Sequence, residues 1–302
     1  MEFYDEMEES FVNEPTTDKF SEAFSKYNMK VDAGWVKSVV EKARKEAAGV
    51  HDKETLKKIF SCIDLTTLKP TDNEDTVLAF VEKVNKMEND YPDLPSVASI
   101  CTWPLYAATV SRSLEVESVK TCCVAGGFPS SQTFFEVKVA ETSLALHDGA
   151  DEIDIVQNAG HVLNSDFDTL ADEIDELKSL CADKTLKVIL ETGALGSLDN
   201  VKKAALIAMY SGADFIKTST GKEVPGADPE SFCVMCKTVR EYADETGRSV
   251  GVKAAGGIST VDDALLYWTI AKIILGKDWL NNTRFRIGAS RLADTLLRAI
   301  CD

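Results

Sequence analysis

The chain has 302 residues, of which 44% are apolar, and a formal net charge of −17 at pH 7. This length and apolar content suit one large domain with a buried core, whereas the negative charge disfavours binding to nucleic acid and docking on anionic membranes. No apolar run in the sequence is long enough to span a membrane, and the acidic first residues differ from a secretory or transit peptide, so we expect a cytoplasmic protein.

The first part of the chain, residues 1–55, is predicted to be an acidic extension with one amphipathic helix. Residues 1–30 show no clear hydrophobic period and are interpreted as a mobile or capping segment. Residues 32–48 place apolar side chains at helical spacing, namely Trp35, Val36, Val39, Val40 and Ala43. We expect this helix to pack on the domain that follows.

Residues 56–302 alternate between predicted strands and predicted helices. Eight segments rich in β-branched residues end in Gly, Ser or Thr and read as strands: 61–68, 96–103, 120–128, 152–159, 185–193, 213–220, 250–257 and 284–291. Eight strands, each followed by a helix, predict a (β/α)8 TIM barrel, an α/β fold. A doubly wound parallel sheet is the alternative.

The cysteines and histidines show no pattern typical of a metal centre. Cys233 and Cys236 form a single CxxC within a predicted helix, without a second pair or a nearby histidine. The three histidines are scattered along the chain, so we expect neither a metal nor another cofactor. Eight cysteines, several of them in apolar strands, agree with the reducing environment of the cytosol.

Two lysines interrupt apolar strand segments. Lys217 ends the run Ala213–Lys217, Lys253 lies in Val250–Gly257, and a glycine-containing loop follows each. Burial disfavours the ammonium form of a lysine, and a second lysine on the neighbouring strand, about 5 Å away, disfavours it further. A neutral amine attacks carbonyl groups, which is the first requirement of Schiff-base catalysis. One such lysine could simply extend to solvent, but two favour an enzyme.

Functional residues of a barrel gather where the strands end. The polar residues predicted there are Asp64, Thr66, Asp154, Glu191, Lys217, Lys253 and Ser290. An acid close to two amines suits proton transfer around a carbinolamine, and Asp154 is our candidate for it. Glu191 is interpreted as structural, whereas Asp64 either orders Lys253 or contacts the substrate.

The last two predicted strands end in sequences that suit a phosphate group. Gly256-Gly257 precedes Ser259, and Gly288-Ala289-Ser290-Arg291 opens the final helix. Both segments expose backbone N–H groups at a helix N-terminus, where an anion is favoured. Many barrels bind phosphate after strands seven and eight.

From about residue 61 to its end, the chain resembles the class I deoxyribose-phosphate aldolases. Six motifs carry the resemblance in order: Asp64–Leu68, Glu152–Asp154, Lys187–Gly193, Phe215–Lys222, Gly251–Gly257 and Arg286–Ser290. It implies reversible cleavage of 2-deoxy-D-ribose 5-phosphate to D-glyceraldehyde 3-phosphate and acetaldehyde, a step of deoxyribonucleotide catabolism.

The resemblance also implies roles for individual residues. Lys217 would form the Schiff base, while Lys253 and Asp154 would perturb that amine and shuttle protons. The substrate-binding residues it predicts are Asp64, Thr66, Thr220, Gly221, Lys222, Gly256, Gly257, Ser290 and Arg291. Among these, Gly221, Gly256, Gly257 and Ser290 would surround the phosphate, with Lys222 beside the acceptor.

The chain departs from the family pattern at two places. Arg291 stands where many members have a second small hydroxyl residue, and it either adds a charged contact to the phosphate or points outward. Some members carry a C-terminal tail whose tyrosine assists proton transfer. This chain ends at Ile300-Cys301-Asp302, so we expect that contribution to be absent or supplied elsewhere.

Two other functions stay open at this point. One is another lysine aldolase of the same barrel, such as a transaldolase-like enzyme acting on longer sugars. The other is a catalytically silent barrel that binds sugar phosphates or a partner protein. The partners we expect are a sugar phosphate and acetaldehyde, with a homodimer as the candidate assembly and neither nucleic acid nor membrane.

Overall fold

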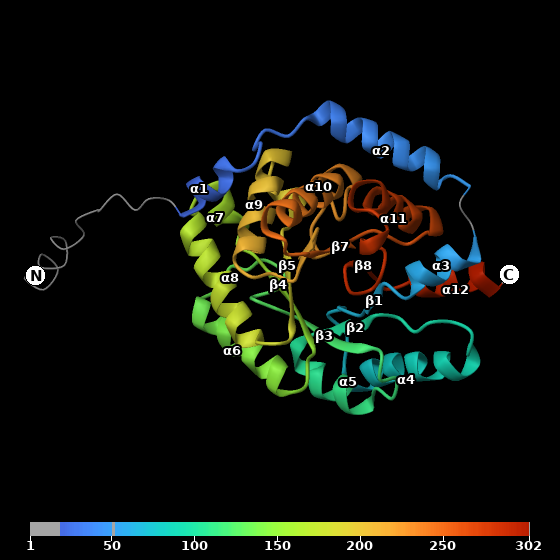
Figure 1. The fold of residues 1–302 in the computed structure, drawn as a ribbon. Helices are drawn as coiled ribbons and strands as arrows, with labels where there is room; N and C mark the ends of the chain where they lie inside the picture. Colours follow the sequence, from blue (N-terminus) through green and yellow to red (C-terminus); the bar gives the residue numbers. More distant parts are fainter. Residues whose placement is uncertain (1–18, 50–51, 302) are drawn as a thin grey trace, which may run out of the picture.

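The structure is a computed structural model, and it describes residues 19–49 and 52–301. Eight parallel strands form a closed barrel in sequence order, with helices around it (Figure 1). The strands are β1 (Ile63–Thr66), β2 (Ser99–Thr102), β3 (Lys120–Ala125), β4 (Glu152–Val156), β5 (Thr185–Ile189), β6 (Phe215–Lys217), β7 (Gly251–Ala255) and β8 (Phe285–Ala289). Each lies within a predicted strand segment. The pairing of β1 with β8 closes the sheet, so the predicted (β/α)8 barrel is confirmed and the doubly wound sheet is wrong.

Helices and short 3-10 turns connect the strands and cover the barrel on all sides (Figure 1). In chain order they are α4 (Glu74–Asp90), η1 (Pro104–Tyr106), α5 (Ala107–Ser113), α6 (Phe135–His147), α7 (Ala159–Leu163), α8 (Phe167–Cys181), η2 (Thr192–Ala194), α9 (Leu198–Tyr210), α10 (Pro229–Thr246), α11 (Val261–Leu275), η3 (Lys277–Trp279) and α12 (Leu292–Cys301). In the described ranges, no helix is both long and apolar enough to cross a membrane.

Local sequence explains where the helices begin. The Asp228 side chain caps α10 by accepting from the backbone N–H of Ser231, and Pro229 occupies the first helical position. Thr260 and Asp263 form a reciprocal capping box at the start of α11. These caps fix the helices that follow β6 and β7, and so fix the loops between strand and helix that surround the barrel mouth.

Three helices precede the barrel: α1 (Lys19–Ser25), α2 (Ala33–Ala47) and α3 (Lys53–Phe60). Helix α2 matches the amphipathic helix expected over residues 32–48, and it lies across the outer side of α10 and α11 (Figure 1). Helix α1 packs on α8 and α9 within a segment for which no helix was predicted, while residues 1–18 lie outside the described residues. The domain boundary placed between residues 55 and 56 falls inside α3.

The apolar core lies mainly between the strands and the surrounding helices. There, aromatic rings of α10, α11 and β8 meet edge to face, with Phe285 5.3 Å from Trp268 and 6.3 Å from Phe232 between ring centroids. The centre of the barrel is different. Branched aliphatic side chains usually fill it, but here its middle holds buried charged side chains that form the floor of the site.

Candidate active site

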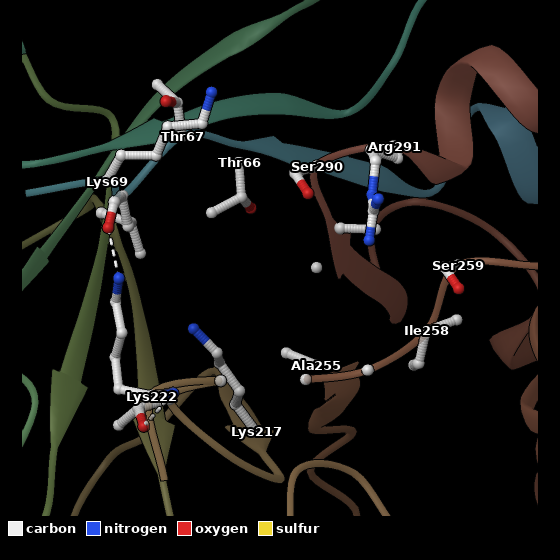
Figure 2. Close-up of a pocket in the computed structure, with 17 residues that line it drawn as sticks. Thr66, Thr67, Lys69, Lys217, Lys222, Ala255, Ile258, Ser259, Ser290 and Arg291 are labelled. Carbon is white, nitrogen blue, oxygen red and sulfur yellow. Dashed lines mark hydrogen bonds between the residues drawn. The ribbon is translucent and has the colours of Figure 1, made fainter. Parts of the chain in front are cut away.

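A cavity of about 300 Å³ opens at the C-terminal end of the barrel (Figure 2). Its walls come from the segments at the ends of β1, β6, β7 and β8. Nine of the twelve residues predicted for the site line it: Thr66, Lys217, Thr220, Gly221, Lys222, Gly256, Gly257, Ser290 and Arg291. The other three, Asp64, Asp154 and Lys253, are each 0% exposed and are not part of the cavity wall.

Lys217 is the last residue of β6, and its side chain points into the cavity (Figure 2). Its Nζ lies 2.9 Å from Oδ2 of Asp154 on β4. The same oxygen accepts a hydrogen bond from Nζ of Lys253 on β7, at 2.7 Å. Lys217 and Lys253 are paired in the β6–β7 register, so both project from the same side of the sheet. The two lysines singled out in the sequence therefore meet on one carboxylate oxygen.

Asp154 belongs to a set of linked ion pairs inside the barrel. Lys253 Nζ lies 2.5 Å from Asp64 Oδ2, and Arg286 bridges Asp64 at 2.5 Å and Glu152 at 2.8 Å. Lys187 Nζ closes the set, 2.6 Å from Glu152 and 2.8 Å from Asp154. We call the following seven residues the interior charge network: Asp64, Glu152, Asp154, Lys187, Lys217, Lys253 and Arg286.

Glu152, Lys187 and Arg286 belong to the site although no role was expected for them, and each lies in one of the six motifs. A signal was present in β4, where Glu152 and Asp154 are two residues apart and therefore face the same side of the strand. Two buried carboxylates on one face require cations on the neighbouring strands. Lys187, the register partner of Asp154 on β5, is the first of them.

The ion pairs of the network shift the pKa values of its buried groups toward their charged forms. Burial opposes ionisation of Asp154, but Lys187, Lys217 and Lys253 outweigh it and hold the pKa of this carboxyl well below its usual range. Burial likewise acts to lower the pKa of Lys253, yet the carboxylates of Asp154 and Asp64 reverse the effect, so that pKa is raised. Carboxylates raise the pKa of Lys187 and of Arg286 against the same burial penalty. These four groups therefore stay ionised at neutral pH.

With every member ionised, four cations face three carboxylates, and the network carries one positive charge in excess. Lys187 has carboxylate oxygens of three residues within 4.0 Å, and Lys253 and Arg286 have two each. Lys217 has only Asp154. The cation with the fewest anionic partners is thus the one that lines the cavity.

Two thiols adjoin the network. Cys101 on β2 and Cys122 on β3 are register partners, and their sulfur atoms and an Asp154 oxygen lie within 4.8 Å of one another. Among the described residues, these three form the one group of His, Cys, Asp and Glu side chains that could hold a metal ion. Lys187 Nζ lies 3.3 Å from Cys122 Sγ, and the Asp154 oxygens already accept from lysines. Those ammonium groups disfavour a further cation at this position.

The loops after β7 and β8 form one end of the cavity. Gly256 and Gly257 both have positive φ, at +98° and +84°, and a Cβ on Gly256 would approach Cα of Gly226 to 2.9 Å. Ser290 and Arg291 precede α12, and the Arg291 side chain turns toward the cavity between Ser290 and Ser259 (Figure 2). Of the two orientations left open for the Arg291 side chain, the structure has the one that points inward. Its guanidinium makes no hydrogen bond or ion pair with any of the residues that the structure describes.

The loop after β6 supplies the opposite wall. Lys222 reaches to the carbonyl oxygen of Leu68, and its Nζ lies 5.5 Å from the centre of the Trp103 ring. Glu191 has a left-handed backbone conformation with φ of 50°, and its Oε2 accepts from the N–H of Thr220 at 3.1 Å. Glu191 thus fixes the loop between Lys217 and Lys222, which agrees with the structural role expected for it.

The position of Asp64 bears on the two roles left open for it, ordering of Lys253 and contact with the substrate. Its carboxylate is fully buried, pairs with Lys253 and Arg286, and is not part of the cavity wall. Asp64 therefore orders Lys253, because the Lys253 ammonium lies between the carboxylates of Asp64 and Asp154.

Comparisons with known proteins agree with this geometry. The model of the DeoC/LacD family of aldolases matches residues 59–288. A Caenorhabditis elegans protein is 40% identical over 269 residues, covering 88% of each chain. The human deoxyribose-phosphate aldolase is 38% identical over 255 residues, covering 81% of this chain and 80% of its own length. The deoxyribose phosphate aldolase of Aeropyrum pernix, described as tetrameric, has a TM-score of 0.66 and 26% identity, covering 88% of this chain and 98% of its own.

Proposed function

This chain belongs to the DeoC/LacD family of aldolases, and from that premise we propose that it cleaves 2-deoxy-D-ribose 5-phosphate reversibly to D-glyceraldehyde 3-phosphate and acetaldehyde. The proposal includes a Schiff base on Lys217. One observation carries it: Lys217 lies at the cavity and shares Asp154 Oδ2 with Lys253, within a network that has one cation in excess.

The excess charge gives Lys217 its role as nucleophile. A lysine must lose its proton before it can attack a carbonyl group. Loss of the Lys217 proton leaves three cations with three carboxylates, so the buried network becomes neutral. Loss of a proton from Lys187 or Lys253 would instead take a cation away from two or three carboxylates. Among the lysines of the network, Lys217 is therefore the one whose amine is freed with the loss of a single ion pair.

The chemical steps follow from that amine. Lys217 Nζ attacks C1 of the open-chain sugar and gives a carbinolamine, which loses water to form an iminium. The iminium accepts the electron pair of the C2–C3 bond as that bond breaks, while the C3 hydroxyl loses its proton and glyceraldehyde 3-phosphate departs. The enamine is then protonated at C2, and hydrolysis releases acetaldehyde and the free lysine.

Asp154 is the group we assign to proton movement in these steps. Its Oδ2 lies within 3 Å of both Lys217 Nζ and Lys253 Nζ, which places it within hydrogen-bonding reach of the carbinolamine nitrogen. Lys253 is held cationic by Asp154 and Asp64. It perturbs the Lys217 amine by charge repulsion and completes the shuttle through Asp154.

The phosphate is proposed to bind at the end of the cavity that carries the glycines. Gly221, Gly256 and Gly257 let the backbone approach the anion closely, and Ser290 lies at the start of α12. The unpaired guanidinium of Arg291 adds a charged donor there. Thr66, Thr220 and Lys222 would contact the acceptor half of the sugar along the opposite wall.

Three coarser proposals accompany this function. We propose an extension before the catalytic barrel, placed in the sequence at residues 1–55, with its boundary moved to the start of α3 at Lys53 so that this helix is not divided. The eight free thiols support the expected cytoplasmic location. A homodimer is the assembly we propose.

Borohydride trapping tests the nucleophile. With acetaldehyde present, reduction should leave a two-carbon adduct on the peptide that contains Lys217, and Lys217→Met should abolish both adduct and cleavage. Lys222→Met is the matched control, because Lys222 also lines the cavity and its loss should leave the adduct on Lys217. An adduct on Lys253 or Lys222 would refute the assignment. A transaldolase-like enzyme would form a borohydride-reduced adduct with longer ketose phosphates instead of acetaldehyde. A catalytically silent barrel would form an adduct with neither kind of compound.

A further inference from the structure

The thiols of Cys101 and Cys122 take no part in the proposed cleavage, yet they adjoin its central carboxylate. Both side chains are fully buried. The Cys122 thiol donates to Asp154 Oδ1 at 3.3 Å, and Lys187 Nζ donates to Cys122 Sγ at the same distance. Leu68 belongs to the same buried apolar cluster as both cysteines and also lines the cavity, so this cluster reaches from the thiols to the space that a substrate enters.

The backbone around the two cysteines permits a covalent bond between them. Cys101 and Cys122 are direct register partners on neighbouring parallel strands, β2 and β3. Such strands lie about 4.8 Å apart, which is within the Cα separation that disulfides span. Both sulfurs approach the same carboxylate oxygen and lie within 4.8 Å of each other. The two sulfurs are thus close enough to be joined by rotation of the side chains together with a small movement of the strands that carry them.

The two thiols also differ in pKa, as a nucleophilic cysteine and the cysteine that resolves it should. The neighbouring Cys122 thiol stabilises the Cys101 thiolate when its S–H turns from Asp154 Oδ1 toward that sulfur, and the charges of Lys253 and Lys217 add to this against the effect of burial, so the pKa of Cys101 is lowered. Burial raises the pKa of Cys122. Cys101 is therefore the nucleophilic sulfur, and Cys122 is the thiol that resolves its oxidised form.

We propose that Cys101 and Cys122 form a reversible disulfide when a peroxide enters the cavity, and that this bond slows cleavage of the sugar phosphate. The Cys101 thiolate attacks hydrogen peroxide, the O–O bond breaks, and uptake of one proton gives Cys101 sulfenic acid and water. The Cys122 thiol then displaces a second water and closes the S–S bond. One peroxide is reduced and two thiols are oxidised. The effect on rate rests on the proposed function, whereas the bond itself does not.

The disulfide would act through Asp154. Once Cys122 is oxidised it has no S–H, so Asp154 Oδ1 loses one of its two donors and keeps only Lys187. Asp154 is the carboxylate that we assign to proton transfer, so its altered hydrogen bonding should reduce turnover about tenfold, the rate equivalent of one lost hydrogen bond to a charged group.

Peptide mapping and kinetics on one sample test the proposal. The protein carries Cys301→Ser, because Cys301 is the exposed cysteine among the described residues and would oxidise between molecules. It is treated with hydrogen peroxide, and half is then reduced with dithiothreitol. The Cys233–Cys236 pair of α10 is the internal control: burial raises the pKa of both thiols, that of Cys233 to about 12, so this pair should stay reduced.

We expect a linked peptide joining Cys101 to Cys122, a fall in cleavage rate that parallels its yield, and recovery of both after dithiothreitol. Cys122→Ala should give no linked peptide. The cleavage rate of this variant should not show the same fall after peroxide and recovery after dithiothreitol, measured against its own reduced form. Absence of the linked peptide, or a linked peptide at full yield with unchanged turnover, would overturn the proposal. If the reduced protein does not cleave deoxyribose 5-phosphate, the proposed function fails, while the linked peptide still decides whether the thiols react.

Discussion

The same substitution at two lysines of the interior charge network should destabilise the protein to very different extents. Lys217→Met and Lys253→Met each remove one cation and leave three cations with three carboxylates. The side chains are matched in size, since methionine replaces most of the lysine stem. The two variants differ only in which carboxylates lose a partner.

The structure gives the size of the difference. Lys253 contacts Asp64 at 2.5 Å and Asp154 at 2.7 Å in a fully buried position. Breaking a buried ion pair costs about 3–5 kcal/mol, and we expect about 3 kcal/mol because Asp64 keeps Arg286 and Asp154 keeps Lys187. Lys217 contacts Asp154 alone and borders the cavity. Its loss removes the excess charge, so the expected change is within about 1 kcal/mol.

Urea denaturation at pH 7 measures both variants against the unmodified protein, with the m-values compared so that a changed unfolded state is recognised. Equal destabilisation of the two variants, or a loss below about 1 kcal/mol for Lys253→Met, would refute the charge reasoning. Kinetics give a second test. In Lys253→Met, Lys217 is no longer the cation in excess, so imine formation should be slow at neutral pH and should recover as the pH rises.

Three further predictions concern pH, phosphate and metals. Folding raises the pKa of Lys253, so the loss of unfolding free energy caused by Lys253→Met should stay constant up to the unfolded pKa of about 10.4 and shrink above it. Folding lowers the pKa of Asp64 and of Asp154, so this loss, measured by urea titration, should also shrink below about pH 3.9. Arg291→Ser should raise KM for the phosphorylated sugar about tenfold or more and leave cleavage of unphosphorylated 2-deoxyribose unchanged; equal effects on both would remove Arg291 from the phosphate site. Exhaustive chelation should not change the rate, and a loss that zinc restores would contradict the lysine mechanism.

The barrel could be predicted from the sequence because its signal is local. Strands buried on both faces leave continuous apolar runs, such as Ile153–Val156 around Asp154, and glycines mark their ends. Lys217 and Lys253 stood out since each interrupts such a run, and the register of β6 and β7 brings them together. Thr66, Lys217, Ser290 and the glycines after β7 follow from the rule that loops after strands form the barrel mouth, whereas Thr220, Gly221 and Lys222 were implied by the family resemblance.

The rest of the site depends on which strands face each other across the barrel. Arg286 contacts Asp64 and Glu152, which are 222 and 134 residues away in the sequence. No local pattern distinguishes this arginine from one that extends to solvent at a strand end. Helix α1 was missed for a related reason: it is only 7 residues long, and its position depends on packing against α8 and α9.

A barrel centre built from mutually paired charges restricts how the sequence can evolve. In an aliphatic centre, residues can be exchanged one at a time if volume is kept. Here each of the seven members has a partner of opposite charge on another strand, so a single substitution at any of them except Lys217 leaves a buried ion short of partners, and its effect depends on what occupies the other positions. We therefore expect the other six positions to change together or not at all across homologues, so that the charged surroundings of Lys217 cannot be exchanged one residue at a time without passing through poorly folding intermediates.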